Sequence, residues 1–73
     1  MSTINCVIGS IIKKARKQRG LSQKQLAEIV QTKQSDISGI EKGKRNPSIE
    51  KVAKIFNALQ YRFEFKIVPF ENE

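Results

Sequence analysis

The sequence predicts a small all-α domain of four helices followed by one C-terminal β-strand. Three observations lead to this prediction. Seventy-three residues suffice for one domain with a small core. Apolar residues recur at helical spacing as far as Leu59. Apolar and polar residues then alternate over residues 61–67, which is the pattern of a strand with one apolar face. We therefore divide the chain into a helical unit, residues 1–60, and a C-terminal segment, residues 61–73.

The first helix is expected over residues 7–19, after a weakly patterned stretch at residues 1–6. Its apolar residues fall at i, i+3, i+4 and i+7, and they are Ile8, Ile11, Ile12 and Ala15. Gly20 is expected to end this helix as its C′ residue. The opposite face carries Lys13, Lys14, Lys17 and Arg19. This basic face either contacts phosphate groups or is simply solvated.

Two short helices joined by a turn are expected within residues 23–42. Ser22 fits the N-cap of the first helix, and Gln25 completes a capping box with it. The apolar stripe of this helix consists of Leu26, Ala27 and Val30. The second helix begins around Gln34, and its only apolar residues are Ile37 and Ile40. Because this stripe is so narrow, the second helix buries too little to be there for packing alone. We expect its exposed polar side to be presented to a partner.

A cationic loop and a fourth helix follow. Gly43 is expected to end the preceding helix, and the cations around it are Lys42, Lys44 and Arg45. Because these cations lie beside an exposed helix, we expect them to bind the phosphate backbone of a nucleic acid. The alternative is that the loop is simply solvated. Pro47 and Ser48 are expected to start the fourth helix. Its apolar positions are Ile49, Val52, Ala53, Phe56 and Leu59.

The predicted strand has an apolar face and no partner within the chain. Its apolar residues are Tyr61, Phe63, Phe65 and Ile67, and Pro69 ends it. A lone strand exposes unpaired backbone N–H and C=O groups, which invite pairing with another edge. We therefore expect this strand to pair between two copies of the chain, giving a two-fold homodimer.

The net charge and the numbers of Cys and His residues limit which partners and which kinds of site this chain can have. Fourteen Lys and Arg residues against seven Asp and Glu residues give a net charge of +7, which indicates a polyanionic partner. The chain has one cysteine, Cys6, and no histidine, so we expect no metal site, no cofactor and no enzymatic activity. No apolar run approaches the roughly 20 residues needed to cross a bilayer, so we expect no membrane partner and a cytoplasmic location.

Residues 23–42, QKQLAEIVQTKQSDISGIEK, resemble the helix-turn-helix of the Cro/repressor (Xre) family. Ala27 occupies the small position where the two helices cross. The flanks GLSQKQLAE and IEKGKRNPS extend the resemblance over approximately residues 8–60. Gln31 is a departure, because the family often has a left-handed Gly there, and another residue costs about 1 kcal/mol.

The resemblance implies binding to double-stranded DNA, with the second helix of the motif in the major groove. The residues it places against base edges are Lys33, Gln34, Ser35 and Ser38. It implies that Gln23 contacts a phosphate and braces Gln34, and that Arg16 and Glu41 form a structural ion pair. A carboxylate is poorly placed among phosphates, so we expect Asp36 to act as a local cap of its helix.

The C-terminal strand indicates a branch of the family. Phage-type repressors continue with a fifth helix at this point, whereas a closing strand resembles the HipB type of antitoxin. This implies a dimeric, nucleoid-associated repressor that binds a palindromic operator, regulates its own operon and binds a HipA-type kinase toxin. One alternative is a control regulator of a phage or a restriction-modification system. Another is an interaction protein that mainly holds a partner through residues 61–73.

Overall fold

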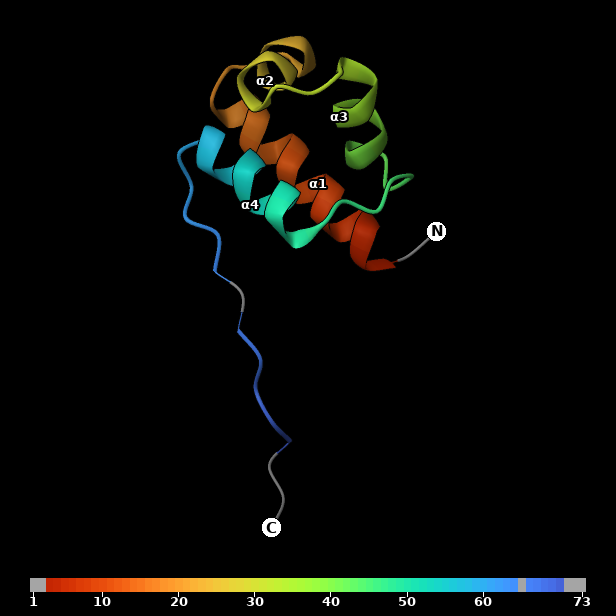
Figure 1. The fold of residues 1–73 in the computed structure, drawn as a ribbon, viewed down its shortest axis with the longest axis vertical. Coiled ribbons are helices and arrows are strands. Elements are labelled where there is room, and N and C mark those ends of the chain that lie inside the picture. The colour runs from red at the N-terminus through yellow and green to blue at the C-terminus, as the bar shows by residue number, and fades with distance from the viewer. Residues whose placement is uncertain (1–2, 65, 71–73) are drawn as a thin grey trace.

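Four helices form the body of the protein in the computed structural model, which describes residues 3–64 and 66–70 (Figure 1). The helices are α1 Thr3–Gln18, α2 Gln23–Val30, α3 Gln34–Glu41 and α4 Ile49–Ala58. α2 contacts both α3 and α4, and α1 contacts α3. The expected all-α unit of four helices is confirmed. None of the helices in the described ranges is long and apolar enough to cross a membrane.

One core joins the four helices. Its buried members come from every helix, and the most completely buried side chains are Ile12, Leu26, Val30, Ile37, Ile55 and Leu59. The apolar stripes predicted for α2 and α3 are both buried, as expected. Two positions differ from the prediction, because Ile11 and Ile49 are about half exposed. Ile55 was not among the predicted positions, and it completes the buried stripe of α4.

Capping residues mark where the helices begin and end. The Ser22 hydroxyl accepts a hydrogen bond from the Gln25 N–H at 3.0 Å, and the Gln25 side chain accepts one from the Ser22 N–H at 2.8 Å. This capping box starts α2 as predicted. Ser48 caps α4 in the same manner through the Lys51 N–H. Gly20 has φ +72° after α1, which is the left-handed conformation expected of a C′ residue.

The start of α1 differs from the prediction. The helix begins at Thr3 rather than Val7, so residues 3–6 are helical. The added turn carries Ile4, which lies three residues before Val7 and seven before Ile11. Spacings of three and four residues place side chains on one helix face, so these residues continue the helical pattern towards the N-terminus. This stripe faces away from the core, and its consequence is considered below.

The C-terminal segment is extended and leaves the helical body (Figure 1). Residues 61–64 and 66–70 contain no strand, so the predicted β-strand is not formed within the described chain. A strand requires a paired edge, and the first two residues of the predicted apolar face, Tyr61 and Phe63, pack on the core instead. Tyr61 meets the Phe56 ring edge-on at 6.4 Å between centroids, and Phe63 stacks on the same ring at 5.7 Å. Ile67 is exposed, and Phe65 lies outside the described residues.

Arg19 ties the start of this segment to α1. Its Nε donates to the Leu59 carbonyl oxygen at 2.8 Å, and its guanidinium carbon lies 4.4 Å from the centre of the Tyr61 ring. The Tyr61 hydroxyl in turn donates to Gln18 at 2.9 Å. Arg19 therefore holds the end of α4, whereas the sequence grouped it with the lysines of α1.

Candidate nucleic-acid interface

α3 is positioned by its two ends and by a narrow apolar stripe. Ile37 and Ile40 are buried beneath it, while Gln34 and Ser35 in its first turn are exposed. The preceding turn passes through Gln31, which adopts the left-handed conformation with φ 65° and ψ 49°. Its N–H bonds back to α2, and the Thr32 N–H bonds to the Ala27 carbonyl at 2.9 Å. The turn therefore keeps the family geometry without a glycine.

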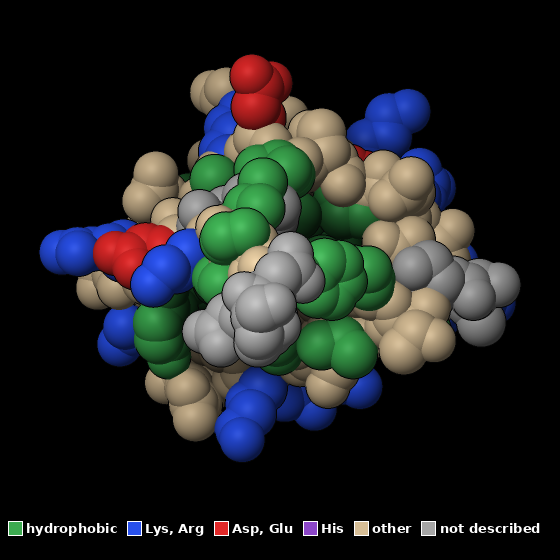
Figure 2. Space-filling model, turned by 90° about the horizontal axis from the view of Figure 1, so that it is seen from below, with side chains coloured by type: hydrophobic (Ala, Val, Ile, Leu, Met, Phe, Trp, Pro, Cys, Tyr) green, Lys and Arg blue, Asp and Glu red, His purple; other side chains and the backbone are tan. Residues whose placement is uncertain are grey.

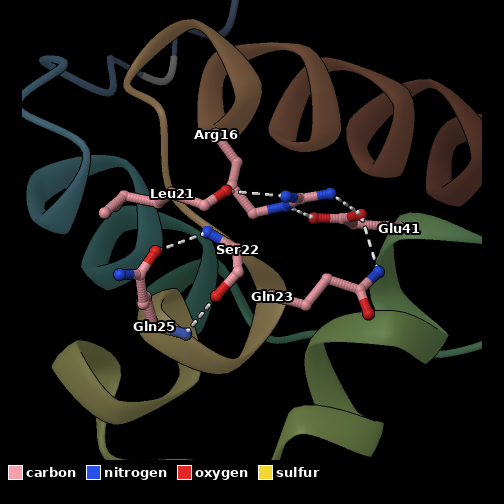
Figure 3. Close-up of polar contacts among 6 residues, drawn as sticks. All are labelled: Arg16, Leu21, Ser22, Gln23, Gln25 and Glu41. Carbon is pink, nitrogen blue, oxygen red and sulfur yellow. Dashed lines mark hydrogen bonds and ion pairs between the residues drawn. The ribbon is translucent and has the colours of Figure 1, made fainter.

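A buried ionic network holds the C-terminal end of α3 against α1 (Figure 3). Arg16 Nε donates to Glu41 Oε2 at 2.6 Å, and Nη2 donates to Oε1 at 3.1 Å. Arg16 Nη1 also donates to the Leu21 carbonyl at 2.7 Å. The two charged residues are only 7% and 8% exposed. The expected pair is thus a bidentate, buried contact, the geometry that Arg and carboxylates form best.

Gln23 belongs to the same network. Its Nε2 donates to Glu41 Oε1 at 3.0 Å, so its amide is directed to Glu41 rather than to Gln34. The expected bracing of Gln34 by the Gln23 amide is therefore wrong, because that amide donates to the buried Glu41 carboxylate, which is the stronger acceptor. A contact between Gln23 and a phosphate stays a prediction. Glu41, the last residue of α3, is therefore bonded both to Arg16 near the end of α1 and to Gln23 at the start of α2.

Gly9 allows α1 to approach the end of α3 closely. A Cβ atom at this position would overlap the backbone carbonyl oxygens of Ile40 and Glu41. The sequence analysis missed Gly9, because helical periodicity concerns apolar side chains and gives no signal for a close backbone contact. Gly9 and the Arg16–Glu41 pair together fix α3 from the side that faces α1.

The predicted base-reading residues lie along the first two turns of α3. Lys33 is the N-cap residue, and its side chain makes no capping hydrogen bond. Lys33, Gln34 and Ser35 are exposed, and Ser38 is half-buried one turn further along. Lys33 and Ser35 line a shallow polar hollow of about 490 Å³ with Gln31 and Thr32. The side chains therefore offer donors, acceptors and one cation on a single surface.

Asp36 has a different role from the local cap that the sequence suggested. Its carboxylate accepts a hydrogen bond from the Thr32 hydroxyl at 2.7 Å and lies 2.9 Å from Lys51 Nζ and 3.3 Å from Arg45 Nη1. The hydrogen bonds from Thr32 and Lys51, with the charges of Lys51 and Arg45, lower the pKa of Asp36 below its usual value. Asp36 therefore joins α3 to α4 and to the loop between them.

The three loop cations stand beside the end of α3. Lys42, Lys44 and Arg45 are all exposed. Arg45 lies across Gly39, where a Cβ atom would come within 2.6 Å of the Arg45 Cγ. Because Gly39 has no side chain, the Arg45 stem covers this part of the outer face of α3 while its guanidinium reaches Asp36. The loop therefore adds positive charge next to the polar side chains of α3.

The arrangement as a whole is a polar and cationic surface built on a helix that is held at its C-terminal end by the buried Arg16–Glu41 pair. Amide and hydroxyl groups at the front of α3 match the donors and acceptors on base edges in a major groove. The exposed cations that follow the C-terminal end of α3 are suited to bind the phosphate backbone.

Several solved structures are similar to most of this chain. The clp gene regulator ClgR from Corynebacterium glutamicum superposes with a TM-score of 0.81 at 23% identity, covering 84% of this chain and 78% of that chain. The restriction-modification controller protein C.AhdI from Aeromonas hydrophila superposes with a TM-score of 0.79 at 30% identity, covering 84% and 92%. No match was found among curated protein sequences.

A third similar structure includes DNA. The restriction-modification controller protein C.Esp1396I, solved as a tetramer in complex with its natural 35 base-pair operator, superposes with a TM-score of 0.78 at 31% identity. The match covers 84% of this chain and 80% of that chain. Residues 12–66, which include α2 and α3, match the model of the helix-turn-helix family HTH_3. The chain therefore belongs to this helix-turn-helix family, whose membership indicates DNA binding and transcription regulation.

Proposed function

We propose that this protein is a sequence-specific regulator of transcription that reads double-stranded DNA with α3 in the major groove. The observation that carries the proposal is the fixed presentation of α3, whose polar first turn is exposed while its last turn is held by the buried Arg16–Glu41 pair. Pre-organisation of this kind lowers the entropic cost of binding. Lys33, Gln34, Ser35 and Ser38 contact base edges, and Gln34 suits adenine because its amide pairs bidentately with that base.

Phosphate contacts set the position of α3 in the groove. Lys42, Lys44 and Arg45 lie beside its C-terminal end and are exposed. Contacts from such cations fix the register of a protein on DNA without reading its sequence. Gln23 supplies a further phosphate contact from the start of α2 through its backbone or side chain.

The active form is a homodimer on a palindromic operator. One four-helix unit offers one recognition helix, and two-fold symmetry pairs it with a second for two half-sites. The apolar and exposed C-terminal segment supports this assembly, because it leaves the body with Ile67, Val68 and Phe70 in solvent. The controller structure with its operator, at 31% identity, supports the same kind of target.

Two biological settings fit this regulator. The 30% and 31% identities to two restriction-modification controllers favour a control protein of such a system. The alternating residues of the C-terminal segment favour the HipB-type setting, in which the protein is a repressor and antitoxin that binds a HipA-type kinase. The adjacent gene and co-purification with its product separate the two settings. A kinase that co-purifies with this protein supports the antitoxin, whereas an adjacent methyltransferase or nuclease gene supports the controller.

Selection of duplexes from a random-sequence pool tests the proposal. We expect enrichment of an inverted repeat whose half-sites lie about 10–10.5 base pairs apart, or a multiple of that spacing, at physiological salt. A pool without any enriched sequence would contradict the proposed function. A protein lacking residues 61–73 serves as the control, and it should retain half-site preference with weaker binding to the full repeat. Loss of protein-partner binding alone would instead support the interaction-protein alternative.

A further inference from the structure

An apolar groove of about 530 Å³ opens on the face from which the C-terminal segment leaves. Figure 2 views the molecule from this side, with the C-terminal segment pointing towards the viewer, and shows hydrophobic side chains near the centre with charged side chains, mostly Lys and Arg, around the edge. The groove lies between α1, α4 and the start of the segment, and its apolar lining consists of Ile8, Ile11, Ala15, Phe56, Tyr61 and Phe63. Ile11 is 51% exposed, and the stripe continues along α1 through Val7 and Ile4. The chain therefore leaves a continuous apolar surface in water.

Near its C-terminus, the same chain carries three further apolar side chains that are exposed to solvent. Ile67, Val68 and Phe70 are 81%, 69% and 93% exposed on an extended backbone. Figure 1 shows this part of the chain running away from all four helices. The apolar groove and the apolar residues 67, 68 and 70 thus occur on one molecule without forming a contact, because none of these three residues lines the groove. Burial of such surface is the main favourable term in association.

The segment is poorly suited to fold back into its own groove. Phe63 is packed on Phe56, so the chain would have to reverse between Phe63 and Ile67. The three residues between them include no Gly, Pro, Asn or Asp, which are the residues that form tight turns. Phe65, Ile67 and Val68 instead favour extended backbone. The occupant of the groove must therefore come from another molecule.

We propose that residues 67–70 of one copy bind in the α1 groove of a second copy, reciprocally, across a two-fold axis. The proposal rests on the homodimer of the proposed function and specifies where its C-terminal segments go. In an antiparallel pair of segments, the end of each lies beside the beginning of the other. The beginning of each segment is Tyr61 and Phe63, which line the groove. Pairing of the two segments therefore delivers each end to the groove of the partner.

Dimensions and charge agree with this exchange. Val68 and Phe70 share one side of an extended chain, about 6.6 Å apart. Ile11 and Ala15, which both line the groove, are one helical turn apart, about 6 Å along α1, so the spacing of the two rows of apolar side chains matches. Lys14, Arg62 and Glu64 stand at the rim of the groove, where Arg62 pairs with Glu64 at 3.1 Å. The charge match therefore rests on Lys14 and on the acidic residues Glu71 and Glu73, which follow the segment in sequence.

Disulfide cross-linking between two full-length variants tests the proposal. Both carry Cys6→Ser, which removes the only native thiol, and one also carries Ile11→Cys while the other carries Val68→Cys. Mild oxidation of the mixture is expected to give a covalent heterodimer as its main product. The matched control replaces Ile11→Cys by Ile29→Cys on α2, because Ile29 is 52% exposed but lies outside the groove.

Three results would overturn the proposal. These are a mixture that gives no heterodimer, equal cross-linking of the Ile29→Cys control, and an internal disulfide formed within a monomer that carries both Ile11→Cys and Val68→Cys. The last result would mean that the segment occupies its own groove.

A second measurement separates the proposal from the proposed function. Phe70→Asp is expected to raise the dimer dissociation constant at least tenfold in analytical ultracentrifugation, whereas Ile29→Asp leaves it unchanged. Binding of Phe70→Asp to a single half-site should stay within twofold of the parent, since residues 66–70 run away from the helical body that contains α3 (Figure 1). An unchanged dimer overturns the groove assignment and leaves DNA binding intact. A protein that dimerises through the groove but selects no DNA sequence contradicts only the proposed function.

Discussion

Arg16 and Glu41 form a bidentate pair between α1 and the last residue of α3, although they lie 25 positions apart in the sequence. Glu41 also accepts from Gln23 at the first residue of α2. A single carboxylate therefore connects three helices, and the connection leaves the opposite end of α3 free to face a partner.

Removing one member of this pair should unfold much of the protein. Glu41→Leu leaves the Arg16 charge buried without its partner, which costs on the order of 3–5 kcal/mol. A domain of this size has a total stability of about that amount, so we expect most of the helical circular dichroism signal to be lost at 25 °C. The double variant Arg16→Met/Glu41→Leu is the control and should regain most of the signal. A Glu41→Leu protein with the native urea midpoint would contradict the assigned role.

Asp36 should make the stability depend on pH in the acid range. Its pKa is lowered in the folded state, chiefly by the Thr32 and Lys51 hydrogen bonds, from an ordinary value of 3.8. The ionised carboxylate therefore stabilises the fold above pH 3.8, and this stabilisation is lost as the pH falls through the lower folded-state pKa. We expect the unfolding free energies of the parent and Asp36→Asn to differ at pH 7 and to converge below pH 3.8.

Urea titrations at several pH values check this prediction. Glu28→Gln provides the control, because it removes an exposed carboxylate on α2. A gap between parent and Asp36→Asn that stays constant down to pH 3 would show that ionisation of Asp36 does not stabilise the fold.

Lys42 and Lys44 should contribute to DNA affinity without contributing to sequence preference. Neutralising either one as Lys→Ala is expected to weaken binding to all duplexes alike, because phosphates are present in every sequence. The slope of log affinity against log salt concentration should fall by about one for each variant, reflecting one fewer released counterion. Lys54→Ala, at an exposed position of α4, is the control. A slope identical to that of the parent would assign these lysines to solvent.

The helices and the turn were predictable because their signals are local. Ser22 and Gln25 are three residues apart, and the buried stripe of α2 lies within five residues. The Arg16–Glu41 pair is distant in sequence, and only the family resemblance suggested it. Gly9 and the ionic cluster around Asp36 escaped prediction, because both depend on contacts between separate elements. Asp36 meets Lys51 only after α4 has packed on α2.

The C-terminal segment shows the limit of periodicity. Alternation predicted a β-strand with one apolar face, but residues 61–64 and 66–70 form no strand, and only Tyr61 and Phe63 of the described residues of that face pack against the core. It could not indicate what the face contacts, because a residue on an extended chain packs equally well on its own core or on another molecule. Phe56 covers the first part of the face, whereas Ile67 remains exposed.

Base reading by α3 should depend most on Gln34, whose amide can pair bidentately with adenine. Equilibrium binding of the parent and of Gln34→Ala should be measured on the selected operator and on a scrambled duplex of the same length and salt concentration. We expect a loss of about 1–3 kcal/mol on the operator, with preference relaxed at one base pair, and almost no loss on the scrambled duplex. Equal losses on both duplexes would contradict base reading by Gln34 and leave it with a phosphate contact alone.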